Sequence, residues 1–224
     1  MRGEPWSVIS SPRAAAPRFF REEVLGLPLL RGQLPRRGDP ARWERKGLRF
    51  FLRAGVHCLL NGPENAALPL TETGTLYRRK AADIALLELE RRGVPPETAV
   101  VGLWASHASR ELEAACRALA GQVRALALEL PERETMSWEL QQDCGIPVFR
   151  GEGVVTLCFT PAPPGEGRLL LGERRPQAPG VTFSAPGVEP PPGCQETPLL
   201  ALLGETGRLG WEQIQVQISQ EEPP

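Results

Sequence analysis

This chain of 224 residues has almost no net charge, very few lysines and no long apolar run. Its 26 basic and 27 acidic residues leave a formal charge of −1 at pH 7, which provides no overall attraction to nucleic acid or to an acidic membrane surface. No segment approaches the roughly 20 consecutive apolar residues that cross a bilayer, and charged residues interrupt the N-terminal region where a secretion signal needs an apolar core. We therefore expect a soluble, cytoplasmic protein without a membrane or nucleic-acid partner.

The chain also lacks the patterns that mark metal sites, disulfide frameworks and common hydrolases. Its five cysteines are odd in number and no two are spaced as C-x-x-C, so we predict free, reduced thiols and no metal site. The spacings of a zinc protease helix, a serine hydrolase elbow, a P-loop and an EF-hand are all absent. A single tyrosine among scattered phenylalanines does not suggest a base-stacking surface for RNA.

The charges are distributed unevenly along the chain. Residues 1–53 hold twelve basic and five acidic side chains, whereas residues 184–224 hold one basic and six acidic ones. This asymmetry has two interpretations: a basic surface that meets an acidic partner, or two ends that neutralise each other in the folded protein. Three further cations, at residues 78–80, fall in the opening turns of a predicted helix, where they oppose the helix dipole. They indicate either an anionic partner or an ordinary solvated basic face.

A strand–helix–strand–helix–strand pattern in the middle of the chain is the clearest structural signal. Residues 98–104 and 123–130 are short, nearly continuous apolar runs, which are typical of strands buried on both faces. Residues 107–120 and 131–145 repeat their apolar positions at helical spacing, and residues 146–149 form a third strand. Short loops between alternating strands and helices imply parallel strands joined by right-handed crossovers. We therefore predict an α/β fold with a Rossmann-like three-layer architecture and a mainly parallel sheet.

Further elements are expected on both sides of this pattern. Towards the N-terminus we predict a short helix at 17–25, one or two strands at 48–60 with a bend near Gly55, and a helix at 75–92. Towards the C-terminus we predict strands at 154–159 and 168–171, a short strand at 181–183, a helical turn at 198–203 and an edge strand at 214–218.

These elements suggest three segments. Residues 1–60 form an irregular N-terminal β segment that packs on the core, and residues 61–175 form the Rossmann-like core itself. Residues 176–224 complete the chain with a segment rich in proline and glycine and a C-terminal strand.

The loop that follows the first strand of the pattern is the leading candidate for a binding site. It reads Trp104-Ala-Ser-His-Ala-Ser-Arg110 and leads directly into a helix, whose free N–H groups and positive dipole end favour an anion. We predict that Ser106 caps this helix and that His107, Ser109 and Arg110 lie in its first turn, where they contact a phosphate or carboxylate. The alternative is that Ser106 only caps the helix, because serine at such a position requires no ligand.

The resemblance to a Rossmann unit covers roughly 50 residues and concerns architecture alone. Dinucleotide binding needs a G-x-G-x-x-G turn so that the backbone can approach the pyrophosphate. Here Gly102 lies within the strand and the fingerprint glycines are absent between residues 103 and 120, so classical NAD(P) binding is disfavoured and we predict no cofactor. Glu129 stands at the end of the second strand, where a ribose-binding carboxylate is expected; an exposed residue at a strand end is the simpler explanation.

These features leave two hypotheses for the function and do not decide whether the chain is an enzyme. The first is a non-catalytic or regulatory protein that binds a protein partner or forms a homo-oligomer, as the proline-rich segment and the opposite charges of the two ends suggest. The second is an enzyme or sensor that binds a small anionic ligand, a phosphorylated metabolite or nucleotide, at residues 104–110. The strand order bears on the second hypothesis, because ligands bind where the order of a parallel sheet reverses.

Overall fold

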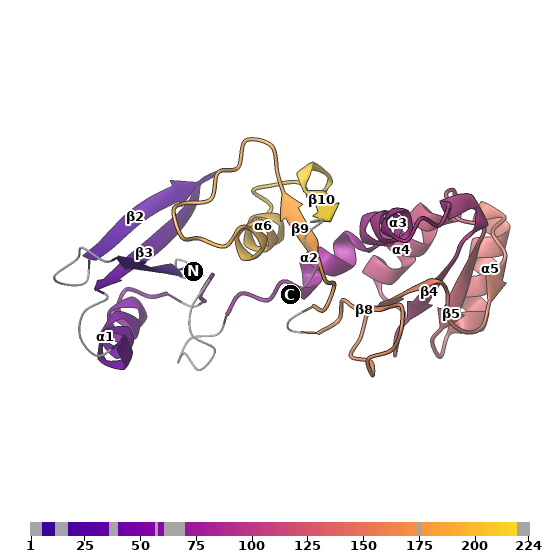
Figure 1. Cartoon of the computed structure of the whole chain (residues 1–224), viewed down its shortest axis with the longest axis horizontal. Helices are drawn as coiled ribbons and strands as arrows, with labels where there is room; N and C mark the ends of the chain where they lie inside the picture. Colours follow the sequence, from indigo (N-terminus) through magenta and orange to yellow (C-terminus); the bar gives the residue numbers. More distant parts are fainter. Residues whose placement is uncertain are drawn as a thin grey trace. The chain divides into compact units, whose positions relative to one another are not determined.

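A computed structural model describes residues 6–11, 18–35, 40–56, 58–60, 70–173 and 176–218 of the chain (Figure 1). The chain divides into two compact units: unit 1 contains Met1–Glu72 and Phe183–Gln215, and unit 2 contains Thr73–Thr182 and Val216–Pro224. Residues 183–215 therefore group with the N-terminal part of the chain, whereas the sequence alone suggests boundaries after residues 60 and 175. Among the described residues, no helix is long and apolar enough to cross a membrane.

Unit 2 contains a parallel sheet together with helices that precede or connect its strands. The helices are α2 (Gly74–Arg79), α3 (Ala81–Arg91), α4 (Arg110–Ala120) and α5 (Arg133–Cys144), with a 3-10 turn η1 (Pro96–Thr98). The strands are β4 (Val100–Trp104), β5 (Ala125–Glu129), β6 (Val148–Phe149), β7 (Val155–Cys158) and β8 (Arg168–Leu170). They lie in the order β6-β5-β4-β7-β8, and each neighbouring pair is parallel.

Helices α3, α4 and α5 form a continuous layer on this sheet. Helix α3 contacts β7, α4 contacts β5, and α5 contacts β5 and β6, while α4 also contacts both of its helical neighbours. Nearly every residue of β5 and β7 is buried, so both faces of these two inner strands are covered. The predicted α/β fold, Rossmann-like and built on a parallel sheet, is therefore confirmed.

The two faces of the sheet carry side chains of different size. Register partners in a parallel sheet point to the same face, so Val101 and Leu126 share one face, whereas Gly102 and Ala127 share the other. Close packing explains the glycine, because a Cβ atom at Gly102 would lie 2.8 Å from the backbone nitrogen of Gly153. Gly102 therefore serves the packing of the sheet and not a phosphate-binding turn.

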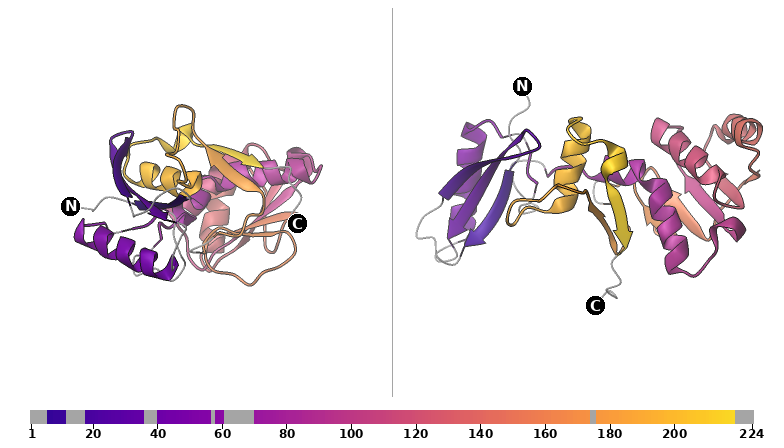
Figure 2. Two further views of the ribbon diagram at one scale, coloured as in Figure 1. Left: turned by 60° about the vertical axis from the view of Figure 1, so that its left-hand side comes forward. Right: turned by 90° about the horizontal axis from the view of Figure 1, so that it is seen from above.

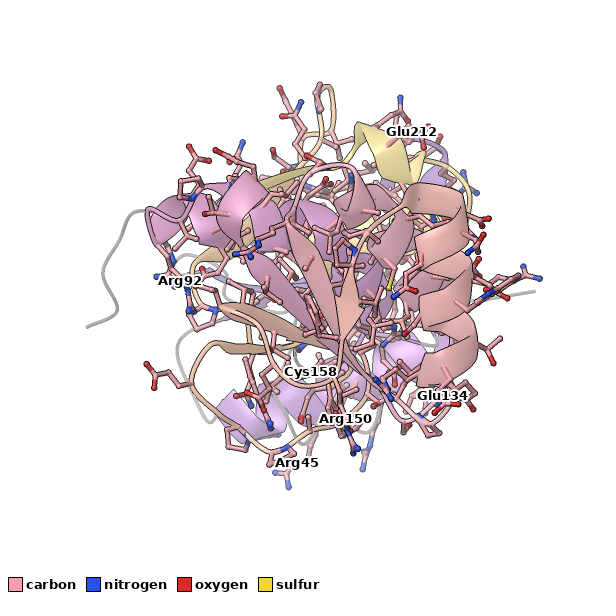
Figure 3. The ribbon with its side chains drawn as sticks, turned by 90° about the vertical axis from the view of Figure 1, so that its right-hand side faces the viewer. Arg45, Arg92, Glu134, Arg150, Cys158 and Glu212 are labelled. Carbon is pink, nitrogen blue, oxygen red and sulfur yellow. The ribbon has the colours of Figure 1, made fainter. Side chains whose placement is uncertain are left out.

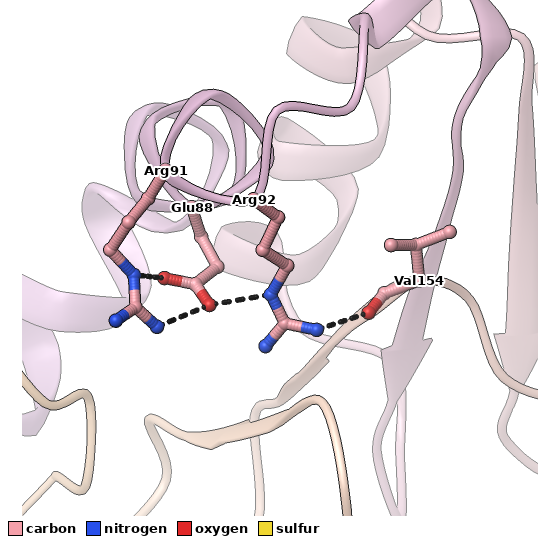
Figure 4. A network of polar contacts seen from close by, with 4 residues as sticks. All are labelled: Glu88, Arg91, Arg92 and Val154. Carbon is pink, nitrogen blue, oxygen red and sulfur yellow. Dashed lines mark hydrogen bonds and ion pairs between the residues drawn. The ribbon is translucent and has the colours of Figure 1, made fainter.

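A buried carboxylate fastens helix α3 to the chain just ahead of β7 (Figure 4). The side chain of Glu88 is 2% exposed and accepts hydrogen bonds of 2.7 Å from Arg91 and from Arg92. Arg92 also donates to the carbonyl oxygen of Val154 at 2.9 Å. Burial alone raises the pKa of Glu88, but the hydrogen bonds and charges of the two arginines outweigh it and lower this pKa below its ordinary value.

Unit 1 contains a three-stranded sheet in the order β1-β3-β2, formed by β1 (Trp6–Ser11), β2 (Arg18–Val24) and β3 (Leu27–Pro35). Helix α1 (Pro40–Arg53) packs on β3 (Figure 2). Further along the chain follow α6 (Glu196–Glu205) and the 3-10 turn η2 (Trp211–Gln213). Strands β9 (Val181–Ser184) and β10 (Gln215–Ile218) pair as a two-stranded sheet, which confirms the strand predicted at 214–218.

The prediction of a short helix at residues 17–25 is wrong, because most of this segment is strand β2. Residues Leu25 and Gly26 adopt φ values of 47° and 73°, the left-handed pair of a tight hairpin turn that connects β2 to β3. The antiparallel pairing with β3 then extends from Val24–Leu27 to Arg18–Gln33. The hairpin pairs with β3 those backbone groups of β2 that face it, and this pairing overrides any local helical preference.

The prediction of strands at residues 48–60 is also wrong, because its first half belongs to helix α1. Phe51 is fully buried among Leu30, Val56 and Leu59, and Phe19 stacks on Phe50 with ring centroids 3.9 Å apart. The predicted bend near residue 55 is the end of this helix, where the N–H of Val56 donates to the carbonyl oxygen of Phe51. Aromatic residues usually favour strands, but tertiary packing decides here.

The helix predicted at 75–92 is present as two consecutive helices, α2 and α3, which meet at Lys80. Gly93 follows the second helix with a φ of 65°, the left-handed position expected after a helix C-cap. The N–H of Val94 then donates to the carbonyl oxygen of Leu89 at 2.9 Å. The predicted termination at Gly93 is therefore confirmed, whereas the continuity of the helix is not.

Candidate functional site

The loop that follows β4 lies where the strand order of the sheet reverses. The chain passes from β4 to β5 and β6 on one side, and then places β7 and β8 on the other side of β4. Hydrogen bonds join the carboxyl ends of β4 and β7: the N–H of Ser106 donates to Oγ1 of Thr160 at 3.0 Å, and the N–H of Phe159 donates to the carbonyl oxygen of Trp104, the last residue of β4, at 2.9 Å. This is the position at which open α/β sheets bind ligands.

Two hollows lie at this carboxyl edge of the sheet. The larger one, which we name the strand-end pocket, has a volume of about 670 Å³. It is lined by Trp104, Ala105, Ser106, Glu129, Leu130, Pro131, Glu132, Arg133, Glu134, Thr135 and Arg150. The smaller one, which we name the switch pocket, has a volume of about 330 Å³. It is lined by Arg78, His107, Ser109, Glu111, Phe159, Thr160, Pro161 and Gly172.

The residues predicted from the 104–110 loop divide between these two hollows. Ser106 lines the strand-end pocket, whereas His107 and Ser109 line the switch pocket. The Oγ atom of Ser106 and the Nδ1 atom of His107 lie 3.1 Å apart, and both side chains are exposed. Arg110 is exposed and lies outside both pockets. The loop therefore does not gather its four polar residues around one anion.

The prediction that Ser106 caps helix α4 is wrong, because Ser109 is the N-cap residue. Its Oγ atom accepts a hydrogen bond of 3.2 Å from the N–H of Leu112. The N–H of Ser106 donates to Thr160, the chain bends at Ser106 and His107, and the helix begins only at Arg110 after the extended residue Ser109. His107 consequently precedes the helix and does not belong to its first turn.

Carboxylates already occupy the positive end of helix α4. Its first turn contains Glu111 and Glu113, and Glu111 forms an ion pair of 3.2 Å with Arg79. Negative side chains at this place complement the helix dipole, and a bound phosphate or carboxylate would meet their repulsion. The charges at the start of α4 are nevertheless mixed, because Arg110 is its first residue and Glu111 and Glu113 pair with Arg79 and Arg117, so the anion site at this loop stays a prediction.

Glu129 is the last residue of β5 and lines the strand-end pocket beside Trp104, its register partner on β4. Its two carboxylate oxygens each accept a hydrogen bond of 3.4 Å from Arg150. The side chains of Glu129 and Arg150 are 38% and 72% exposed. In Figure 3, Arg150 and Glu134 lie at the same edge of unit 2 as Cys158, the last residue of β7. The residue proposed to bind ribose thus has a loosely held partner.

Sequence reasoning missed several residues that line these pockets, among them Thr160 and Arg150. Each follows closely after a strand: Thr160 lies two residues after β7, and Arg150 directly follows β6. Because parallel strands end at a common edge, the first polar residues after every predicted strand are candidates for one site. Applied to all the strands, this rule finds both residues.

Two of the three cysteines of unit 2, Cys116 and Cys158, are buried and provide no activated thiol. Cys158 is fully buried at the end of β7, and burial raises its pKa to about 11. Cys116 on α4 is also fully buried, and burial raises its pKa to about 12. Both thiols therefore stay protonated at neutral pH. In the part of the chain that the structure describes, no three histidine, cysteine or acidic side chains gather closely enough to hold a metal ion.

Comparisons with known protein families and with curated proteins find no match to this chain.

Proposed function

We propose that unit 2 is a ligand-binding module that holds a small polar ligand, of metabolite or nucleoside size, in the strand-end pocket. The observation that carries this proposal is the position of the pocket, at the carboxyl ends of β4 and β5 and next to the reversal of strand order. Its volume of about 670 Å³ lies within the range usual for small-molecule sites.

The pocket combines an apolar wall with groups that donate and accept hydrogen bonds. Trp104, half-buried at the end of β4, supplies a flat apolar surface. Ser106 supplies a hydroxyl that both donates and accepts, Glu129 supplies two acceptor oxygens, and Arg133 and Arg150 supply donors. A few polar groups that converge on an apolar wall are typical of pockets that orient a metabolite.

The test is a thermal-shift screen of the full chain with nucleosides, nucleotides, sugars, sugar phosphates and amino acids. Ligands that raise the Tm are then tested on Ser106→Leu, which places a bulky apolar side chain at the wall of the pocket, and on Gln142→Leu, which places the same side chain on an exposed part of α5 outside the pocket. We expect Ser106→Leu to abolish the shift and Gln142→Leu to retain it. The proposal fails if no compound raises the Tm, or if both variants respond like the unaltered chain.

A second candidate, binding of a protein partner or a second copy, rests on a different surface. Trp138 on α5 is 64% exposed and Phe149 on β6 is 54% exposed, and aromatic residues are enriched in protein interfaces. Sedimentation velocity of the unaltered chain and of Trp138→Glu tests the self-association. A monomer at all concentrations, together with no protein that co-purifies with the unaltered chain from its native host, counts against this candidate.

A further inference from the structure

We propose that helix α1 of unit 1 docks an acidic, amphipathic helix of a partner protein on its solvent-facing side. The inference concerns a surface that the proposed function of unit 2 does not use, so each of the two can fail without the other. The observation that carries it is a row of unpaired arginines on α1 with exposed apolar residues on both sides.

Helix α1 packs one side on β3 and turns the opposite side to solvent. Gly47 and Phe51 are buried on the packed side, where Phe51 forms a core cluster with Leu30 of β3. Four arginines recur at helical spacing on the other side, and all four are exposed. At a rise of about 1.5 Å per residue they form a row about 16 Å long. We name this row the arginine stripe: Arg42, Arg45, Arg49 and Arg53.

The arginine stripe has no acidic partner in the part of the chain that the structure describes. None of the salt bridges there involves one of its members. Like charges three or four residues apart on a helix repel each other, so the fold carries a concentration of positive charge that it does not neutralise. Of the two interpretations of the uneven charge along the sequence, this observation favours a basic surface that meets an acidic partner.

Exposed apolar side chains border the arginine stripe, which favours a protein over a nucleic acid as the partner. At about 100° per residue, Leu52 lies on one side of the stripe and Phe50 on the other, and they are 48% and 41% exposed. A face that combines arginine with an aromatic residue is typical of protein interfaces. A phosphate backbone offers no apolar contact to such residues, and the net charge of −1 gives the chain no overall attraction to nucleic acid.

The packing of α1 within unit 1 disfavours a membrane as the partner. An amphipathic helix binds a bilayer by burying its apolar side among the lipids. In α1 that side is already occupied, because Phe51 is fully buried and Phe50 stacks on Phe19 of β2 with ring centroids 3.9 Å apart. Only the arginine stripe and its two apolar borders remain available for a partner.

The spacing of the arginine stripe defines the chemistry of the partner. Carboxylates three or four residues apart on a second helix repeat at the same interval as the arginines, so two such helices can pair side by side. Each guanidinium presents a planar fork of donors that matches one carboxylate. Apolar residues beside the acidic row of the partner then cover Leu52 and Phe50. The partner segment is therefore a helix with an acidic row and apolar borders.

The experiment measures binding of four probes to the full chain at low salt. Fluorescence anisotropy follows a helical peptide with glutamates at every third or fourth position and leucines beside them, a scrambled peptide of the same composition, and an oligouridylate of equal charge. Co-sedimentation follows vesicles that contain phosphatidylserine. We expect the acidic helix to bind at least about tenfold more tightly than each of the other probes, and added salt to weaken its binding.

Three results overturn the inference. The first is binding of the oligouridylate or of the vesicles that is equal to or tighter than binding of the acidic helix, which assigns the surface to another class of partner. The second is equal binding of the scrambled peptide, which means that charge alone is recognised. The third is no saturable binding of the acidic helix at millimolar concentration.

Substitutions on α1 test the role of the arginine stripe. Arg49→Glu should weaken binding of the acidic helix at least about tenfold, whereas Arg124→Glu, an equal change of charge at an exposed position of unit 2, should change it less than about twofold. Leu52→Ser should weaken it about threefold, because it removes an apolar contact. Circular dichroism and the Tm verify that each variant is folded, and Arg45→Glu serves if Arg49→Glu is not. Equal effects of the reversals on α1 and at Arg124 contradict the inference.

Discussion

The two edges of the parallel sheet hold ion pairs of the same chemical type in opposite environments. Near the amino edge, Glu88 is 2% exposed and accepts hydrogen bonds of 2.7 Å from Arg91 and Arg92. At the carboxyl edge, Glu129 is 38% exposed and its bonds to Arg150 measure 3.4 Å. Burial and short bonds make the first carboxylate part of the fold. Exposure and long bonds make the second carboxylate a weakly held surface partner of Arg150.

The largest effect that this contrast predicts is the loss of stability in Glu88→Gln. We expect the free energy of unfolding to fall by about 2 kcal/mol, because Arg91 and Arg92 lose the carboxylate that they share. Urea denaturation at pH 7 measures the change. The neighbouring variant Glu90→Gln, at an exposed position, should change the value by less than about 0.5 kcal/mol. Equal small effects for both variants contradict a structural role of Glu88.

Close packing near the amino edge predicts an effect of similar size in Gly102→Ala. The added Cβ atom would lie 2.8 Å from the backbone nitrogen of Gly153, beside the chain that Arg92 holds, so we expect a loss of about 2 kcal/mol. The matched control is Gly121→Ala, where φ is −86° and no atom lies within 4 Å of the new Cβ. Thermal unfolding should leave this control unchanged or slightly stabilised.

The pH dependence of stability tests the structural role of Glu88 through the lowered pKa of its carboxyl group. Because the pKa of Glu88 is lowered from 4.5 in the folded protein, its contribution is present above the unfolded pKa and is lost as the pH falls through the folded pKa. The difference in unfolding free energy between the unaltered chain and Glu88→Gln should therefore be constant above about pH 5.5 and shrink below about pH 4.5. A difference that grows on acidification contradicts this assignment.

A smaller effect tests which serine caps helix α4 at the carboxyl edge. Ser109→Ala removes the acceptor for the N–H of Leu112, so we expect a loss of about 1 kcal/mol in the free energy of unfolding. Ser106→Ala removes an exposed hydroxyl that lies outside the helix, and we expect less than about 0.5 kcal/mol. The opposite ranking in chemical denaturation would restore Ser106 as the cap.

The smallest expected effect is the coupling between Glu129 and Arg150. A double-mutant cycle with Glu129→Gln and Arg150→Gln should give a coupling energy below about 0.5 kcal/mol, because the pair is exposed and its bonds are long. High salt should reduce it further. A coupling energy above about 2 kcal/mol would mean that this pair stabilises the fold as strongly as the ion pairs of Glu88 do. That result would contradict the contrast between the two edges of the sheet.

The parallel sheet was predictable from sequence because its signals are local. Strands buried on both faces appear in the sequence as continuous apolar runs, as at residues 98–104 and 123–130. In the connecting helices the apolar residues recur at helical spacing, so each of these signals can be recognised within a short stretch of sequence. Unit 1 gives weaker local signals. Phe19 and Phe50 stack although they lie 31 residues apart on a strand and a helix, so neither element can be assigned before the other is in place.

The sequence by itself determined the Rossmann-like class, the missing glycine fingerprint and the placement of Ser106 and Glu129 near the ends of buried strands. These features depend on residue types and on spacings of a few residues, and both can be read from the sequence before the fold is known. Tertiary structure alone decided that Ser109 caps helix α4, that Ser106 and His107 line different pockets, and that Arg150 stands beside Glu129. Each of these facts depends on strand order and on contacts between loops far apart in the chain, such as Ser106 with Thr160.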